Sequence, residues 1–193
     1  MLDTWQEWVG TFTGVVAMTV VALPLTPLAV WALARHRSST GSSSAWRTSL
    51  ADVGMVYGTV PWVWMILLPG ERAVSGPVSL VPLRDLLAIL ADGQGATGQI
   101  VGNLLVFAAL GFFAPLRFAA LASVRRILAL GAACSVLVET AQYVLQLDRV
   151  SSVDDVLLNA AGAGLAALAS RHWWRDADGT SADRPEPVAA VAR

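Results

Sequence analysis

The sequence predicts an all-α membrane protein: a bundle of about five transmembrane helices, with the N-terminus outside and the C-terminus inside. Composition is the first reason, because 55% of the 193 residues are hydrophobic and only 14% are charged, against roughly a quarter charged in ordinary soluble domains. The mean hydropathy of +0.60 agrees. The second reason is the length of the apolar runs, and the third is the placement of arginine between them.

Five apolar runs approach the length of about 20 residues that a helix needs to cross a bilayer. They are residues 12–34, 50–68, 100–118, 127–147 and 153–169. Pro24 and Pro27 predict a kink in the inner half of the first helix, which is tolerated where other groups satisfy the freed carbonyls. The end of this run resembles a signal-peptidase site at Ala34. We expect no cleavage, because the preceding region is acidic and the apolar run is too long.

Basic side chains mark alternate connections. All 13 are arginine. Those around the first connection, the third connection and the tail are Arg35, Arg37, Arg47, Arg117, Arg125, Arg126, Arg171, Arg175 and Arg184. The other two connections hold Arg72, Arg84 and Arg149, with acidic residues nearby. By the positive-inside rule the arginine-rich connections are cytoplasmic. Five spans satisfy this alternation, whereas four or six would break it.

These runs divide the chain into three parts. Residues 1–49 hold the first helix and an inner loop rich in serine and arginine, residues 50–170 form the main transmembrane domain, and residues 171–193 are expected to be a disordered cytoplasmic tail. Cys134 is the single cysteine, so an intramolecular disulfide is excluded.

Polar residues interrupt the last three runs at matching depths. They are Asn103, Glu139, Gln142, Asp154, Asp155 and Asn159. Glu139 precedes the end of its run at Leu147 by eight residues, which places it roughly 12 Å below the outer edge. Ionisable groups within a membrane are costly unless they face one another or a wet cavity. We therefore expect one polar pocket in the outer half of the bundle, capped by Arg149 from the external turn.

Two structural explanations compete with a functional site. Amides such as Asn103 and Gln142 also serve as hydrogen bonds between membrane helices, worth about 0.6 kcal/mol each. Asp154 has a second explanation as a helix cap or first-turn acid. Glu139 is harder to explain in this way, because packing rarely needs a carboxylate at such depth. Asp155 shares a face with Asn159 and is the better site candidate of the acidic pair.

Three ordered motifs in this region resemble the VanZ-like family of membrane proteins. They are GNLLVFAALGFFAP (residues 102–115), SVLVETAQ (residues 135–142) and RVSSVDDVLLNAAG (residues 149–162). The resemblance covers about residues 50–170. It implies a multi-pass protein of the bacterial cytoplasmic membrane and a role in the cell envelope. It also implies a link to antibiotic resistance, because one member is associated with reduced susceptibility to the glycopeptide teicoplanin.

Three function classes remain open. In the first, the protein binds an amphipathic envelope molecule, such as a lipid-linked glycan or a lipoglycopeptide, through Asn103, Gln142, Arg149, Asp154 and Asn159. In the second, it is a hydrolase or transferase in which Glu139 or Asp155 acts as the general base. In the third, it is a transporter, which the absence of a visible inverted repeat disfavours. We expect membrane lipids as partners, and no cofactor, no metal and no nucleic acid.

Overall fold

A computed structural model describes residues 11–69, 79, 81–92, 96–147 and 152–174. Within these residues the chain is helical, apart from an isolated parallel bridge between Ser79 and Ser152. The elements are α2 (Phe12–Ala22), α3 (Leu25–Ser39), α4 (Ala45–Ile66), α5 (Arg84–Asp92), α6 (Ala96–Val106), α7 (Ala108–Arg117), the 3₁₀ turn η1 (Ala119–Leu121), α8 (Val124–Val144) and α9 (Val153–Ala169). The all-α prediction is confirmed for the described residues.

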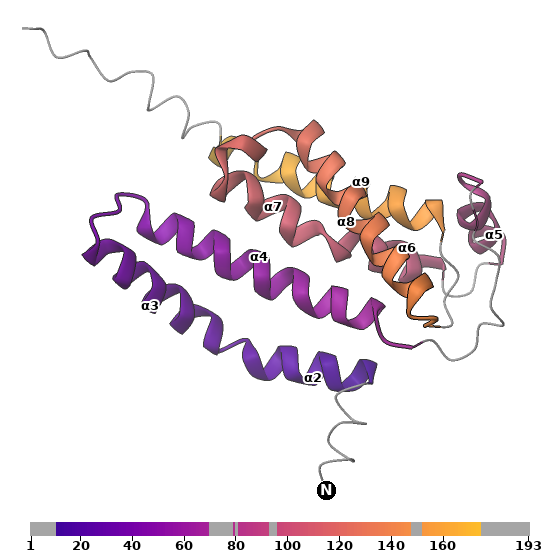
Figure 1. The fold of residues 1–193 in the computed structure, drawn as a ribbon, viewed down its shortest axis with the longest axis horizontal. Coiled ribbons are helices and arrows are strands. Elements are labelled where there is room, and N and C mark those ends of the chain that lie inside the picture. The colour runs from indigo at the N-terminus through magenta and orange to yellow at the C-terminus, as the bar shows by residue number, and fades with distance from the viewer. Residues whose placement is uncertain (1–10, 70–78, 80, 93–95, 148–151, 175–193) are drawn as a thin grey trace, which may run out of the picture.

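The helices form a layered bundle in which consecutive long segments run in opposite directions (Figure 1). The pair α2 and α3 packs on α4, α4 on α7, α7 and α6 on α9, and α9 on α8. The short helix α5 lies at one end of the bundle. The same end holds the C-terminus of α4, the start of α6, the end of α8 and the start of α9.

Two helical segments are long and apolar enough to cross a membrane: Thr97–Arg117, which joins α6 and α7, and Val124–Val144. The bent pair α2 and α3 would make a third. The remaining two predicted spans do not meet the same criteria of length and composition. α9 has 17 residues. α4 has 22, but it contains Arg47, Asp52 and three tryptophans. Five spans and their orientation therefore stay a prediction.

The predicted kink in the first segment is present, with a bend of 50° between α2 and α3. α2 ends at Ala22, and Pro24 precedes the first residue of α3. Because Pro27 has no N–H, the carbonyl of Leu23 loses the partner it would have in a continuous helix. The Thr26 hydroxyl donates to that carbonyl at 2.8 Å. The backbone N–H of Thr26 donates to the same carbonyl at 3.1 Å, so Thr26 compensates the break with both its side chain and its backbone, as expected for proline in a membrane helix.

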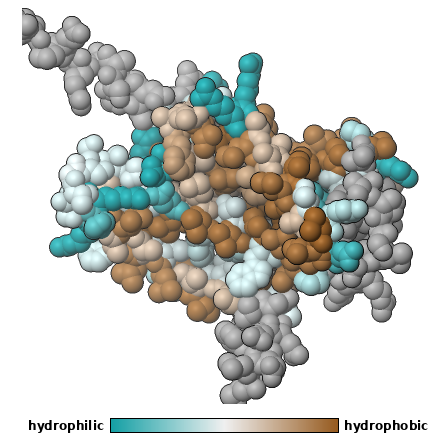
Figure 2. Space-filling model, viewed as in Figure 1, coloured by the Kyte–Doolittle hydropathy of each residue, from teal (hydrophilic) through white to brown (hydrophobic). Residues whose placement is uncertain are grey.

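Apolar residues make up much of the face of the bundle seen in Figure 2. Many of the buried residues are small. Leu137 and Val144 on α8 are each 69% exposed. Buried residues include Ala34, Ala51 and Ala163. Soluble monomers rarely expose apolar surface on this scale. The distribution suits a protein whose outer surface contacts lipid.

Close approach between backbones holds α9 in the centre of the bundle. A Cβ added at Gly162 would overlap the carbonyl oxygen of Leu104 on α6, and one at Gly111 on α7 would overlap that of Ala163. Small residues allow such contacts between membrane helices. Glycine is therefore required at both positions, and α9 can bring its polar first turns against α6 and α8.

Residues 171–174 form a further helical turn after α9. They lie within the part of the chain expected to begin a disordered tail. Trp174 is buried, and the Arg47 guanidinium donates to the carbonyl of Trp173 at 3.0 Å. The rest of the predicted tail, residues 175–193, lies outside the described residues.

Candidate functional site

A pocket of about 430 Å³ opens at the end of the bundle where α5 lies. We call it the amide–carboxylate pocket. It is lined by Ile66 of α4, Gln99 and Asn103 of α6, Glu139 and Gln142 of α8, and Asp155 and Asn159 of α9. Five of the predicted site residues thus surround one cavity: Asn103, Glu139, Gln142, Asp155 and Asn159.

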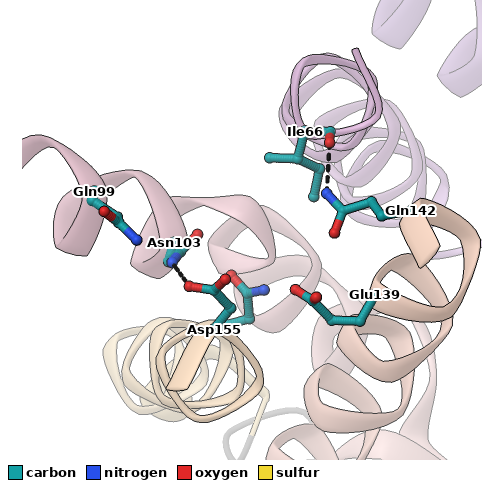
Figure 3. A pocket seen from close by; sticks show the side chains of 7 residues that line it. Ile66, Gln99, Asn103, Glu139, Gln142 and Asp155 are labelled. Carbon is teal, nitrogen blue, oxygen red and sulfur yellow. Dashed lines mark hydrogen bonds between the residues drawn. The ribbon is translucent and has the colours of Figure 1, made fainter. Parts of the chain in front are cut away.

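Helical spacing explains how α6, α8 and α9 each contribute two side chains. Asn103 follows Gln99 by four residues, and Gln142 follows Glu139 by three, so each pair occupies one helix face. The Asn103 amide on α6 donates a hydrogen bond to the Asp155 carboxylate on α9 (Figure 3). The contact between α6 and α9 therefore also joins two walls of the pocket.

Asn159 is the most deeply buried polar residue in the lining, with 3% of its surface exposed. Its Nδ2 donates to the hydroxyl of Ser135 on α8 at 2.8 Å. Its Oδ1 accepts no hydrogen bond from the described residues. An unsatisfied buried acceptor is costly. A molecule that donated a hydrogen bond to this oxygen would remove that cost.

Gln142 links α8 to the end of α4. Its Nε2 donates to the carbonyl oxygen of Ile66 at 2.6 Å (Figure 3). This carbonyl lies in the last turn of α4, where no intrahelical donor follows. Gln142 thus combines the two roles weighed from the sequence, since it joins two helices and also lines the pocket.

Glu139 projects from α8 into the pocket, and its carboxylate points toward Asp155 on the opposite wall (Figure 3). The described lining contains these two carboxylates, four amides and no basic side chain. Carboxylates accept hydrogen bonds, whereas amides both donate and accept. The walls are therefore suited to a group rich in N–H or O–H donors. No group of three or more His, Cys, Asp or Glu among the described residues is placed to hold a metal ion.

Asp154 and Arg149 differ from the other predicted site residues. Asp154 is buried, and its carboxylate accepts hydrogen bonds from the backbone N–H groups of Leu83 and Leu86, at the start of α5. It is not among the residues that line the pocket. The structure thus favours the capping explanation, with the difference that Asp154 caps α5. Arg149, the predicted cap of the pocket, lies outside the described residues.

Sequence reasoning missed two polar residues: Gln99, which lines the amide–carboxylate pocket, and Asp52, which belongs to a separate network of charged groups. Gln99 lies one turn before Asn103 on the same face, so the spacing used for the other pairs could have identified it. Asp52 lies in the second apolar run and meets the criterion applied to Glu139. The carbonyl of Ile66, in contrast, has no signal in the sequence, because every residue has a backbone carbonyl.

Asp52 belongs to a separate polar network at the opposite end of the bundle, which we call the arginine end. Its carboxylate lies 2.5 Å from Nη2 of Arg37 on α3 and 2.8 Å from Nε of Arg117 on α7. Arg37 also donates to the buried hydroxyl of Ser49 at 3.1 Å. This network ties α3, α4 and α7 together.

A family model described as VanZ/LLP1 matches residues 55–174, which is more than half of the chain. The matched part contains all seven residues that line the amide–carboxylate pocket. No curated protein and no solved structure matches the chain.

Proposed function

The chain belongs to the VanZ/LLP1 family, and we propose that it binds the polar head of an amphipathic envelope molecule in the amide–carboxylate pocket. The observation that carries the proposal is the convergence of two carboxylates and four amides from three helices on one cavity. Isolated interhelical hydrogen bonds would not require a cavity. A shared cavity, in contrast, is what a bound head group needs.

The proposed setting is the bacterial cytoplasmic membrane, crossed five times, with the pocket in its outer half. Arginines support this orientation. The helix ends and connections at the arginine end, which belong to α3, α4, α7, α8 and α9, carry seven arginines: Arg35, Arg37, Arg47, Arg117, Arg125, Arg126 and Arg171. The positive-inside rule makes that end cytoplasmic. The pocket at the other end then faces the outer leaflet.

The topology has a direct test. In a Cys134→Ala background, a membrane-impermeant maleimide should label Val81→Cys in intact cells, because Val81 is exposed at the pocket end. It should label Ser42→Cys, in the exposed connection between α3 and α4, only after the cells are opened. The reverse pattern would overturn the orientation.

The ligand chemistry follows from the walls. A cavity of about 430 Å³ lies within the range of small-molecule sites, about 300–1,000 Å³, and holds a sugar-sized group rather than a complete lipid. Hydroxyl, amide and amine groups would donate to Glu139, Asp155 and the Oδ1 of Asn159. The apolar tail would lie along exposed residues of α8 such as Leu137 and Val144. A lipid-linked glycan or a lipoglycopeptide has this combination.

Family membership connects this binding to the cell envelope. We propose that occupation of the pocket lowers susceptibility to glycopeptides of the teicoplanin type. Two routes are available: sequestration of the antibiotic, or binding of an envelope precursor that the antibiotic would otherwise reach. Direct titration of the purified protein with each molecule separates them.

One observation favours an enzyme as the second candidate. Glu139 and Asp155 lie on opposite walls of the same pocket (Figure 3), and two carboxylates in different environments can divide the roles of general acid and general base. Asp155 accepts a hydrogen bond from Asn103, which fixes the position of its carboxyl group. In this alternative Glu139 or Asp155 acts as the general base on a lipid-linked substrate, and the other carboxyl group donates the proton.

Glu139→Gln and Asp155→Asn separate the two candidates, because each keeps the shape of the side chain and removes the charge. The control is Thr140→Ala on α8, whose exposed hydroxyl donates to its own helix at Val136. Binding of labelled lipid-linked glycan to purified protein and glycopeptide susceptibility of cells are measured together. We expect both variants to lose binding and susceptibility effects in parallel. Binding that is kept while the cellular effect is lost would favour catalysis, and binding and turnover that survive both changes would overturn the site.

A further inference from the structure

A second pocket, of about 190 Å³, lies at the arginine end and is not used in the proposal above. We call it the arginine pocket. The lining residues that matter here are Ser44, Arg47 and Thr48 at the start of α4, Arg117 at the end of α7, and Trp174. Its described lining combines two guanidinium groups with hydroxyl and indole groups and includes no carboxylate. The polarity is thus opposite to that of the amide–carboxylate pocket.

The N-terminus of α4 forms one wall of the arginine pocket. α4 is 22 residues long, and its N-cap residue Ser44 makes no side-chain hydrogen bond to the first turn. The first bond back to Ser44 comes from the N–H of Thr48 at 3.0 Å. The earlier N–H groups of the helix have no acceptor within it, and they carry the positive end of the helix dipole. Anions bind readily at such a terminus.

Trp174 supplies an independent observation. It lines the pocket, is 7% exposed, and its buried Nε1 donates to no acceptor in the part of the chain that the structure describes. Buried donors are nearly always satisfied. The turn that carries Trp174 is held by the bond from Arg47 to the carbonyl of Trp173 and by an edge contact, with ring centroids 5.3 Å apart, between Trp173 and Phe112. The wall of the pocket therefore contains a residue whose buried N–H lacks an acceptor among the described residues.

The charge balance leaves this region positive. Asp52 is shared between Arg37 and Arg117, so these three side chains together keep one positive charge. Arg47 adds a second, and the partner of its Nη2 is a neutral carbonyl. Arginine presents its donors in a planar fork that matches the oxygens of a phosphate group.

We propose that the arginine pocket binds a phosphate group, held by Arg47 and Arg117, by the N–H groups at the start of α4 and by the indole N–H of Trp174. Two sources supply this chemistry: the head group of an anionic phospholipid, and inorganic phosphate. The site is independent of the amide–carboxylate pocket, because the two lie at opposite ends of the bundle.

The experiment uses the full chain in nanodiscs of phosphatidylcholine, followed by the indole N–H resonance of Trp174 in NMR spectra. Trp174→Phe identifies this resonance by removing it. One arm adds phosphatidylglycerol to the nanodisc, and the other adds inorganic phosphate. Arg47→Gln removes a proposed ligand, whereas Arg125→Gln removes the same charge from the exposed start of α8, outside the pocket lining. Retained lipid is counted by native mass spectrometry.

We expect the Trp174 resonance to shift on addition of phosphate or phosphatidylglycerol. The half-saturating concentration should rise about tenfold in Arg47→Gln, the loss expected for a hydrogen bond to a charged group, and stay unchanged in Arg125→Gln. Trp174→Phe should retain less phosphatidylglycerol in the mass spectra while keeping its helical content. This second variant tests the proposal even where Arg47→Gln fails to fold. A response to phosphate alone identifies the free anion, and a response only to phosphatidylglycerol identifies the lipid. Equal weakening by both arginine variants, or a silent Trp174 resonance in both arms, would overturn the proposal.

Discussion

The two ends of the bundle differ in the groups that contact their acidic side chains, which lie within apolar helices. At the arginine end the carboxylate of Asp52 is neutralised directly by Arg37 and Arg117. At the other end Asp155 accepts a hydrogen bond from the amide of Asn103. Glu139 points toward Asp155 across the cavity. The ion pairs of Asp52 with Arg37 and Arg117 hold α3, α4 and α7 together. At the pocket end the two carboxyl groups share their cavity with amides and not with guanidinium groups, so this end is the one suited to binding a group that donates hydrogen bonds.

α9 relates the two ends, because its first turns supply Asp155 and Asn159 and its far end leads to Trp174. Its middle is held by close backbone contacts at Gly162 and Gly111, and its first turns by hydrogen bonds that link Asp155 and Asn159 to neighbouring helices. The following substitutions compare the effects of these two kinds of contact on stability and on ligand binding.

The largest effect is expected for Gly162→Ala. The new methyl group would overlap the backbone of Leu104, so α6 and α9 must move apart. Overpacking costs about 1–3 kcal/mol, and we expect the upper part of this range because a backbone cannot rotate away. Asn103 would also separate from Asp155, so ligand binding falls together with stability. Unfolding in mixed detergent micelles measures the first effect and titration the second.

Gly102→Ala is the matched control, because a Cβ at this position of α6 meets no atom within 4 Å. It should leave both stability and binding close to those of the original chain. If Gly162→Ala behaved like Gly102→Ala, the close contact between α6 and α9 would not exist, and the shared wall of the pocket would be lost with it.

The second effect separates the ends directly. Asp52→Asn leaves Arg37 and Arg117 facing each other without a counter-ion. Removing one partner of a fully buried pair costs about 3–5 kcal/mol. These side chains are 24–34% exposed, so solvent screening reduces the expected loss to about 1–2 kcal/mol. Ligand binding at the far pocket should be unchanged.

Asp155→Asn is the counterpart at the pocket end, where we expect the reverse pattern: a clear loss of binding and a smaller change in unfolding. Loss of binding in Asp52→Asn at full stability would show that the two ends are coupled, and the division of roles between them would be wrong.

The all-α class predicted from the sequence is confirmed for the described residues, and five of the predicted site residues line one cavity, whereas the number of spans and their orientation stay predictions. Depth and helical spacing brought together Asn103, Glu139, Gln142, Asp155 and Asn159 because both follow from regular helix geometry. The same reasoning could not separate Asp154 from Asp155, since both stand in the first turn of α9 and only the position of α5 assigns Asp154 to backbone donors. The arginine network escaped notice because its three members come from three distant segments, and no local spacing relates them.

A third prediction concerns the support of Asn159. Ser135→Ala removes the hydroxyl that accepts from Asn159 Nδ2 in a buried position. The amide would then be left without this partner, and we expect a loss of about 1 kcal/mol in unfolding free energy. Ligand affinity should fall by a smaller factor than in Asp155→Asn, because the pocket keeps its charges. Thr140→Ala serves as the control, and an equal effect of the two would mean that the bond to Ser135 does not hold Asn159.

The smallest global effect is expected for Asp154→Ala, which tests whether the two neighbouring acids of α9 have different roles. The variant removes the acceptor for the N–H groups of Leu83 and Leu86, so the start of α5 loses its cap. Loss of a cap costs about 1 kcal/mol. Because α5 has its main described contacts with α6 and α9 at one end of the bundle, this loss should appear as faster amide hydrogen exchange in α5. Global unfolding and ligand affinity should stay the same, as a local opening requires. If Asp154→Ala instead weakened binding as strongly as Asp155→Asn, the pocket would extend to α5, and Asp154 would return to the binding residues that the sequence predicted.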